Sequence, residues 1–398
     1  MQRSTRSALG AAALIATTAL VLAGCTTPPS TGGGTDTGGE NTAVTYLNTA
    51  DGTCAAGPNP DVKFDEAKAV IERFQQQASS IWTDEPLPEP VAPGTTVVFA
   101  NNDTPVAQLW LPFFEDAITS VGAKFVNASV GTSAESQQAG FNSIIAMDPD
   151  AVIMAAIDPT FVEDQLRTLE DNGSVIVASS QPGVADFGLD DSFGGTASSI
   201  VNGRVLAAGA VYFTCGTGDQ FVFYNSPELG FSGVQMEAAQ EYLAELAPNA
   251  TLRTVDISVA DAAPQDKIVS DLQAHPETQF FITPLDQYQI GLAAAADLVG
   301  IENDRGFGQS SLPPNYEQIA NDEQTAGFGI DFEAYVFGQV DEAFRKLQGV
   351  FKPYGSWEDI YQTLSRVIVK ANVEDYPGGI FQAYDNIRGD YLELWAGK

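Results

Sequence analysis

A single histidine limits the acid–base chemistry available to this chain. His275, in LQAHPE, is the only one in 398 residues and follows a predicted helix, on the side away from the predicted strand ends. A serine–histidine–aspartate arrangement would need it, and GFSG lacks the spacing of a G-x-S-x-G nucleophile elbow. The chain also lacks a G-K-[ST] phosphate loop, and its histidine and few free cysteines disfavour zinc. We therefore expect no enzymatic activity, no cofactor and no metal centre.

Three aspartates lie close together in the segment DFGLDDSFGG, namely Asp186, Asp190 and Asp191. Carboxylate oxygens are suitable ligands for Ca²⁺, but the segment lacks the pattern of an EF-hand loop. A solvated acidic turn is the alternative explanation, and it is the one that we favour.

The N-terminal residues have the parts of an export signal. Arg3 and Arg6 precede an apolar run that is shorter than the ~20 residues of a membrane-spanning helix. The run ends in LAG followed by Cys25, which resembles the lipobox of bacterial lipoproteins. This resemblance implies a signal peptide over 1–24 and a Cys25 that carries fatty acyl chains such as palmitate. We expect an extracytoplasmic protein anchored to the cell membrane by lipid, with a flexible Thr-, Gly- and Pro-rich linker over 25–43.

Cys54 and Cys215 are the two cysteines that remain after lipidation of Cys25. Thiols of exported proteins often pair, and a disulfide would fix the prefix to the second half of the chain. Cys215 could equally be a small buried residue. We favour pairing and leave the alternative open.

The acidic composition excludes two classes of partner. The formal net charge is −34, with 52 acidic against 18 basic residues. Nucleic acids and anionic headgroups attract basic surfaces, so we expect no nucleic-acid binding and no electrostatic attraction to a membrane. Hydrophobic residues make up 44% of the chain, which is ample for a core of two ordinary domains.

Strand and helix patterns alternate along most of the chain. Residues 44–94 form a prefix, with a predicted helix over 65–82 and a proline-rich connector. The predicted strands are 95–102, 124–130, 150–156, 174–180, 220–226, 250–258, 278–284 and 305–311, and the predicted helices are 104–122, 133–148, 158–173, 230–246, 266–274 and 290–299. The strands are almost entirely apolar, which is typical of parallel sheets covered on both faces. The sequence therefore predicts an α/β fold of two doubly wound parallel-sheet lobes, with a ligand cleft between the carboxyl ends of their strands.

Several segments in this order resemble the type I periplasmic sugar-binding proteins, the ribose-binding family of ABC importers. The segments are GAKF, IIAMDPDAVIMAAIDPT, DNGSVIVASS, LQAHPETQFFIT and QTAGFGID…VDEAFRKLQG, and the likeness covers about residues 95–370. The resemblance implies two lobes with a three-segment hinge, which we place near Leu189, Asp331 and Arg366. The first lobe would comprise 95–189 and 331–365, and the second 190–330 and 366–398. It also implies a monomer that delivers a small molecule to ABC permease subunits.

The ligand site departs from the ribose-type pattern. Ser179 and Ser180 match its Asp-Arg pair, Gln235 matches an arginine, and Ser310 matches an aspartate. Without a charged fork for a carboxylate or phosphate, a neutral sugar-like or other polar solute fits better than an anion. The candidate ligand-binding residues are Asn102, Asp103, Trp110, Asp158, Ser179, Ser180, Tyr224, Gln235, Asp286, Tyr288, Ser310 and Asp331. A ligand-binding module for a membrane sensor is an alternative to transport, and a cell-surface hydrolase is a weaker one.

Overall fold

The structure is a computed structural model, which describes residues 44–378, 381–383 and 385–397. The predictions for the signal peptide, for lipidation of Cys25 and for most of the linker lie outside the described residues. Within the described ranges, no helix combines the length and apolarity that a bilayer crossing requires.

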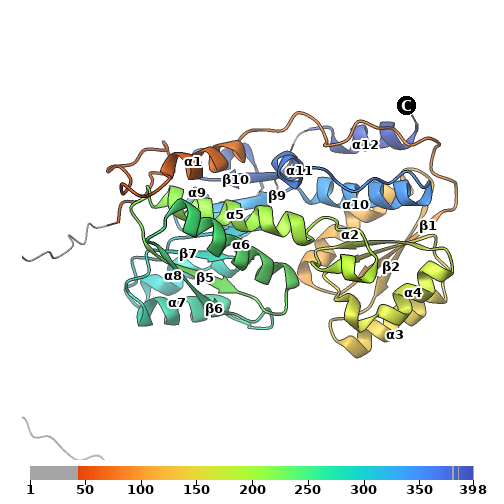
Figure 1. Cartoon of the computed structure of the whole chain (residues 1–398), viewed down its shortest axis with the longest axis horizontal. Coiled ribbons are helices and arrows are strands. Elements are labelled where there is room, and N and C mark those ends of the chain that lie inside the picture. The colour runs from red at the N-terminus through yellow and green to blue at the C-terminus, as the bar shows by residue number, and fades with distance from the viewer. Residues whose placement is uncertain (1–43, 379–380, 384, 398) are drawn as a thin grey trace, which may run out of the picture. The chain divides into compact units, whose positions relative to one another are not determined.

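The first sheet has four parallel strands in the order β2-β1-β3-β4. These strands are β1 (Thr96–Asn101), β2 (Lys124–Ser129), β3 (Ala151–Ala155) and β4 (Val175–Ser179). Its helices are α2 (Pro105–Thr119), α3 (Ala134–Ile145), α4 (Glu163–Asp171) and, from much later in the chain, α10 (Phe332–Leu347). Helix α10 contacts α2, β3 and β4, and therefore belongs to this first lobe (Figure 1).

The second sheet has six strands in the order β10-β9-β8-β7-β5-β6. Its strands are β5 (Gln220–Asn225), β6 (Thr251–Asp256), β7 (Phe280–Thr283), β8 (Gly306–Gln309), β9 (Ala326–Ile330) and β10 (Ser365–Ile368). Its helices are α5 (Thr196–Phe213), α6 (Gly230–Leu246), α7 (Pro264–Ala274), α8 (Leu292–Asp297) and α9 (Pro313–Ala320). Only β10, at one edge of this sheet, pairs antiparallel.

The inner strands of both sheets are buried on both faces, because alternate strand residues enter different apolar clusters, whereas the edge strands β2 and β6 are partly exposed. In β1, Val97 and Phe99 pack with Phe114 of α2, whereas Val98 packs with Phe141 of α3 on the opposite face. In β5 the same alternation separates the cluster that contains α5 and α6 from the one that contains α7 and α8. Parallel strands with such two-sided burial read as continuous apolar runs. The prediction of two doubly wound α/β lobes is confirmed.

Local capping explains where several helices begin. The Thr104 side chain accepts a hydrogen bond from the Ala107 amide, and a proline follows at the first helical position of α2, as the sequence predicts. The predicted helix over 158–173 is instead two pieces, the 3₁₀ turn η1 (Pro159–Phe161) and α4. They are separated at Val162, whose φ of −131° is not helical. The prefix helix α1 (Phe64–Arg73) is shorter than its predicted span of 65–82.

Between β4 and α11 (Trp357–Leu364) the chain passes between the two lobes three times, and it crosses again between α1 and β1 and between β10 and α12 (Ile387–Trp395). The first passage joins β4 to α5 and the second joins β9 to α10. The third lies between α10 and α11, because α11 already packs on α5 of the second lobe. This passage is earlier in the chain than the position near Arg366 that we predicted. We also grouped residues 366–398 with the second lobe, but the last helix, α12, packs on α10 of the first lobe (Figure 1).

Candidate functional site

The carboxyl end of β1 carries Asn102 and Asp103, which close the turn into α2. The Asn102 side-chain amide donates to the Ala155 carbonyl oxygen at 3.1 Å, and its oxygen accepts from the Thr104 amide and hydroxyl. Asp103 is exposed and accepts from the Ser129 hydroxyl at 2.5 Å. Asn102 therefore joins β1 to β3 at this edge of the sheet, while one carboxylate remains open to solvent.

The ends of β3 and β4 carry Asp158, Ser179 and Ser180. Asp158 caps η1 by accepting from the Thr160 amide at 2.9 Å. Ser179 is fully buried, and its hydroxyl donates to the Gln339 side-chain oxygen at 2.8 Å. The Ser180 hydroxyl lies 2.8 Å from the Tyr335 hydroxyl. Both serines thus fix α10 to the end of β4.

Trp110 forms an aromatic wall at the start of α2. Its ring centroid lies 5.3 Å from that of Tyr335 and 6.3 Å from that of Phe332, both in the first turn of α10. The indole is 7% exposed, and its Nε1–H has no hydrogen-bond partner among the described residues. A buried donor without a partner costs about 1–3 kcal/mol, so this N–H is well suited to donate to a ligand.

Gln235 and Gln309 form the corresponding polar pair in the second lobe. Gln235 lies in the second turn of α6, and its amide nitrogen donates to the side-chain oxygen of Gln309, the last residue of β8, at 2.6 Å. Both side chains are buried, and the Gln235 Oε1 accepts no hydrogen bond from the described residues. Gln235 was predicted, whereas we missed Gln309 although it directly precedes the predicted Ser310.

Asp286 follows β7 and is fully buried in a network of neutral donors. Its carboxyl oxygens accept from the side chains of Gln289 at 2.5 Å, Ser311 at 2.5 Å and Gln324 at 2.9 and 3.0 Å. Burial raises the pKa of Asp286 to about 8, because desolvation outweighs these hydrogen bonds. Close packing leaves little room here, since a β-carbon added at Gly308 would lie 2.6 Å from this carboxyl group. Asp286 therefore joins the segments that follow β7 and β8 to the segment that leads into β9, all within the second lobe.

Asp331 lies in the second passage between the lobes and is also buried. One of its carboxyl oxygens accepts from the Ala334 amide at the start of α10, and the other accepts from the Ala383 amide. Burial is the main cause that raises its pKa to about 7. Because backbone amides occupy both oxygens, the structure gives Asp331 a capping role.

The two predicted tyrosines, Tyr288 and Tyr224, direct their hydroxyl groups to different parts of the second lobe. The Tyr288 hydroxyl lies 2.7 Å from the hydroxyl of Ser226, which follows β5, so Tyr288 lies at the edge of the sheet. The Tyr224 hydroxyl donates instead to Asp271 of α7 at 2.8 Å, and its ring is fully buried in the core between the sheet and that helix. Tyr224 and Tyr288 share this apolar cluster, but the Tyr224 hydroxyl bonds to α7 and not to a group at the carboxyl edge of the sheet.

Backbone strain marks the same two edges. Asp103, Ala156, Ser180 and Ser310 each follow a strand and have positive φ values of 63°, 50°, 54° and 61°. Such conformations cost of order 1 kcal/mol for residues with a β-carbon and gather at ligand sites. The edges also meet: a β-carbon added at Gly230, which begins α6, would lie 3.1 Å from the Gln181 amide nitrogen of the first lobe.

The arrangement offers hydrogen bonds without a cationic clamp. No candidate side chain is a lysine or an arginine, and none of them makes an ion pair. His275 is exposed beside Glu277, in the turn that joins the end of α7 to the start of β7, and therefore not at the carboxyl ends of the strands. Of the acidic segment, Asp190 pairs with Lys346 at 2.9 Å and Asp191 accepts from the amide that begins α5. In the described ranges, no group of three or more His, Cys, Asp or Glu side chains could hold a metal ion.

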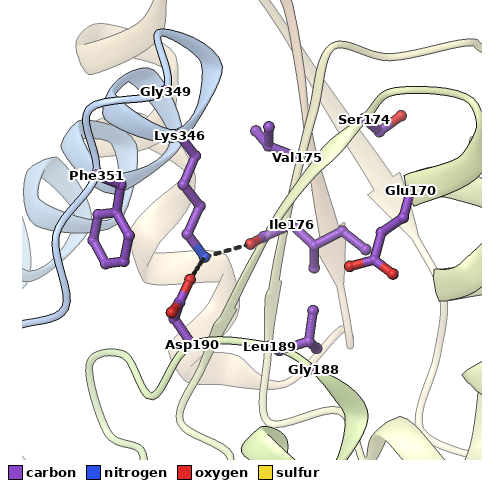
Figure 2. A pocket seen from close by; sticks show the side chains of 10 residues that line it. All are labelled: Glu170, Ser174, Val175, Ile176, Gly188, Leu189, Asp190, Lys346, Gly349 and Phe351. Carbon is purple, nitrogen blue, oxygen red and sulfur yellow. Dashed lines mark hydrogen bonds and ion pairs between the residues drawn. The ribbon is translucent and has the colours of Figure 1, made fainter.

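Two cavities lie away from these edges. One, of about 360 Å³, opens beside the amino-terminal half of β4, where Lys346 donates to the Ile176 carbonyl and pairs with Asp190 (Figure 2). The other, of about 540 Å³, lies between Tyr46 and the loop that follows α8. Ligands of open α/β sheets bind at the carboxyl ends of the strands, so neither cavity is at the expected place.

Comparison with known proteins places the chain among binding proteins. The family model described as a periplasmic binding protein domain matches residues 95–350. No curated protein shows significant similarity to the chain. A solute-binding protein of an ABC transporter from Burkholderia graminis C4D1M, in complex with D-arabinose, superposes with a TM-score of 0.60 at 14% identity. The match covers 71% of this chain and 97% of that one.

Two further solved structures give the same result. A periplasmic solute-binding protein from Actinobacillus succinogenes 130z, with bound D-allose, has a TM-score of 0.58 at 14% identity and covers 72% of this chain and 100% of its own. An ABC sugar transporter subunit from Rhodobacter sphaeroides 2.4.1 has a TM-score of 0.59 at 17% identity, with coverages of 70% and 99%. At these identities the comparison establishes the fold alone.

Proposed function

Because the chain belongs to the periplasmic binding protein family, we propose that it is a lipid-anchored, extracytoplasmic solute-binding protein of an ABC importer. It binds a small neutral, sugar-like solute between the carboxyl edges of its two sheets and delivers it to a permease as a monomer. The fold is the type I fold of periplasmic sugar-binding proteins.

The observation that carries the neutral ligand class is the pair of unpaired polar atoms. Gln235 Oε1 in the second lobe is an acceptor and Trp110 Nε1 in the first lobe is a donor; both are buried, and neither has a partner in the described part of the chain. A hydroxyl group both donates and accepts, so a polyol could satisfy both atoms. Neither atom carries a charge, and a carboxylate or phosphate would find no guanidinium to pair with.

The known ligands of similar folds agree with this chemistry. The structures that resemble this chain hold D-arabinose, D-allose and, in a protein from Agrobacterium vitis, allitol. All three are uncharged molecules with several hydroxyl groups. We transfer only this shared chemistry to the present chain, because its candidate residues differ from the ribose-type pattern.

The disulfide supports a location outside the cytoplasm. Cys54 and Cys215, whose pairing the sequence left open, are joined in the structure with a Cα–Cα distance of 5.8 Å. Disulfides persist mainly in oxidising compartments. Together with the lipobox that ends at Cys25, this bond supports an exported protein that remains attached to the cell membrane.

A thermal-shift panel tests the proposal. We expect D-allose, D-arabinose or allitol to raise the melting temperature, since a ligand at 100 times its Kd stabilises the protein by ~2.7 kcal/mol. Phosphate and acetate serve as anionic controls and should have no effect. A shift with anions and none with a broad set of sugars and polyols would contradict the proposed ligand class.

A further inference from the structure

Residues 44–93, which we call the strap, precede the segment that matches the binding-protein family at 95–350. In Figure 1 this segment runs from α1, beside the second lobe, towards α12 beside the first. We propose that the strap is an additional link between the lobes, outside the three hinge passages, which limits how far they separate when the cleft opens.

The first anchor of the strap lies on the second lobe. The Leu47 amide donates to the Phe213 carbonyl at 2.9 Å, the Cys54–Cys215 disulfide follows, and the Lys63 amide donates to the Leu246 carbonyl at 2.8 Å. Helix α1 packs on α5 and α6. A covalent bond and a buried helix face therefore hold the N-terminal half of the strap on this lobe.

The second anchor lies on strands β10 and β9 of the second lobe. The Phe74 carbonyl accepts from the Val367 amide of β10 at 2.9 Å, and the Gln75 carbonyl accepts from the Arg366 guanidinium at 2.8 Å. The Phe74 ring meets the Phe328 ring of β9 at 5.3 Å between centroids. Up to this point the strap moves with the six-stranded sheet.

The third anchor lies on the first lobe. Trp82 packs against Phe193 at 5.3 Å, and its ring lies so close to α10 that a β-carbon added at Gly338 would be 2.7 Å from it. The Glu85 carbonyl accepts from the Arg345 guanidinium at 2.6 Å. The Leu87 amide then donates to the Leu394 carbonyl of α12 at 2.9 Å. The C-terminal half of the strap therefore moves with α10 and α12.

Only residues 76–81 connect the two halves of the strap. Most of them are exposed, and their one side-chain hydrogen bond among the described residues is a 3.4 Å contact from Gln362 to the Gln76 carbonyl. A chain of this length spans at most about 20 Å when fully extended. The connector can absorb a modest hinge rotation, but it becomes taut when the lobes move further apart.

The proposal gives the disulfide a mechanical role. Tension on the strap acts from the C-terminal side of α1, and Cys54 lies on the N-terminal side of this helix. The Cys54–Cys215 bond therefore keeps the strap attached to the second lobe even where the noncovalent contacts of α1 break. A ligand-free protein held near its closed separation loses less freedom on closing, which favours binding. The proposal concerns lobe motion, and its test needs no ligand, so it can fail or succeed independently of the proposed function.

Cutting the strap tests this proposal directly. A protease site that replaces residues 76–81 of the full chain, and is cut between positions 79 and 80, keeps the connector length; after cleavage the disulfide retains the N-terminal fragment. Spin labels on E135C in α3 and D266C in α7, both at exposed positions, report the distance between the lobes, with Cys25 replaced by Ser. We expect cleavage to shift the distance distribution to longer values by several ångströms and to broaden it.

Two controls make the outcome decisive. The uncut variant, whose connector keeps its length, should match the parent protein, and the same site placed at Glu302, in an exposed loop within the second lobe, should leave the distribution unchanged after cleavage. Circular dichroism before and after cleavage checks that both lobes remain folded. An unchanged distance distribution after the 79/80 cut, with the fold intact, would overturn the proposal.

Discussion

At the carboxyl edge of the first sheet, polar side chains make separate contacts, whereas at the edge of the second sheet several of them meet at one carboxyl group. Asp158 caps a single turn and Asn102 joins β1 to β3. Ser179 and Ser180 each contact one side chain of α10. Asp286 instead gathers side chains from three separate segments, and Gln235 joins α6 to β8. The second lobe therefore has a polar network that shares one carboxyl group, while the first lobe has separate pairwise contacts.

The largest expected effect is on stability, from Asp286→Ala. The substitution leaves the donors on Gln289, Ser311 and Gln324 without their acceptor inside the protein, so we expect a loss of about 3 kcal/mol in the free energy of unfolding. Asp158→Ala at the first edge removes only a cap and should cost about 1 kcal/mol. Urea denaturation measures both free energies of unfolding. Equal losses would contradict the difference that we describe between the two edges.

The same carboxyl group predicts how stability depends on pH. Because the pKa of Asp286 is raised to about 8, the folded state keeps its proton at pH values where the unfolded state has lost it. The stabilising contribution is therefore complete below the unfolded pKa near 4 and is lost as the pH rises through about 8. Asp331, with a pKa raised to about 7, contributes with the same sign.

Asp286→Asn isolates this contribution. The neutral side chain keeps the shape of the carboxyl group and does not titrate, so we expect the fall in stability between about pH 5 and pH 8 to be shallower than in the parent protein. Denaturation curves at a series of pH values provide the measurement. Parallel pH profiles for the two proteins would show that Asp286 is charged in the folded state.

A smaller effect, on affinity, is expected from Trp110→Phe in the first lobe. The phenyl ring preserves most of the contact with Tyr335 but removes the unpaired N–H, so a solute that uses it should bind about tenfold more weakly. Trp357→Phe is a matched control, since Trp357 is also 7% exposed and lies in α11. Isothermal titration with D-allose, D-arabinose and allitol compares them; equal affinities would remove Trp110 from the site.

The smallest effect is expected from Thr104→Ala. Loss of the cap on α2 should cost about 1 kcal/mol in the free energy of unfolding, and Thr104→Ser should restore it because the hydroxyl is kept. Thermal denaturation of the three proteins is sufficient. If the effect of Thr104→Ala approached that of Asp286→Ala, the contacts at the first edge would not be separate from one another.

Local signals predicted the fold well because each depends on few neighbours. The helix over 230–246 has the predicted bounds, and apolar strands correctly indicated buried parallel sheets. The positions of α11, α12 and the strap helix α1 were not predictable, because the apolar face of an amphipathic helix can be buried against either lobe. Only tertiary packing on α5 or α10 decides between them.

The candidate site could be predicted only in part. Strand ends identify which residues reach an edge, and Ser180 and Tyr288 lie there beside polar partners, whereas Gln235 of α6 was identified by the resemblance. The strand-end signal failed for Tyr224, because the last residues of a strand still alternate between the two faces of the sheet, and this side chain turns towards α7. Gln309 and Tyr335 were missed because their importance comes from partners that are far away in the sequence.

We propose that a neutral solute binds where the Gln235–Gln309 pair leaves the Gln235 Oε1 acceptor open, and Gln235→Ala removes this acceptor. Gln240→Ala is the matched control, since Gln240 is exposed on the same helix. We would titrate both variants and the parent protein with D-allose, D-arabinose and allitol. We expect Gln240→Ala to bind a sugar or polyol with the affinity of the parent protein, and Gln235→Ala to bind it about tenfold more weakly. Unchanged affinity in Gln235→Ala for a sugar that the parent protein binds would contradict the proposal.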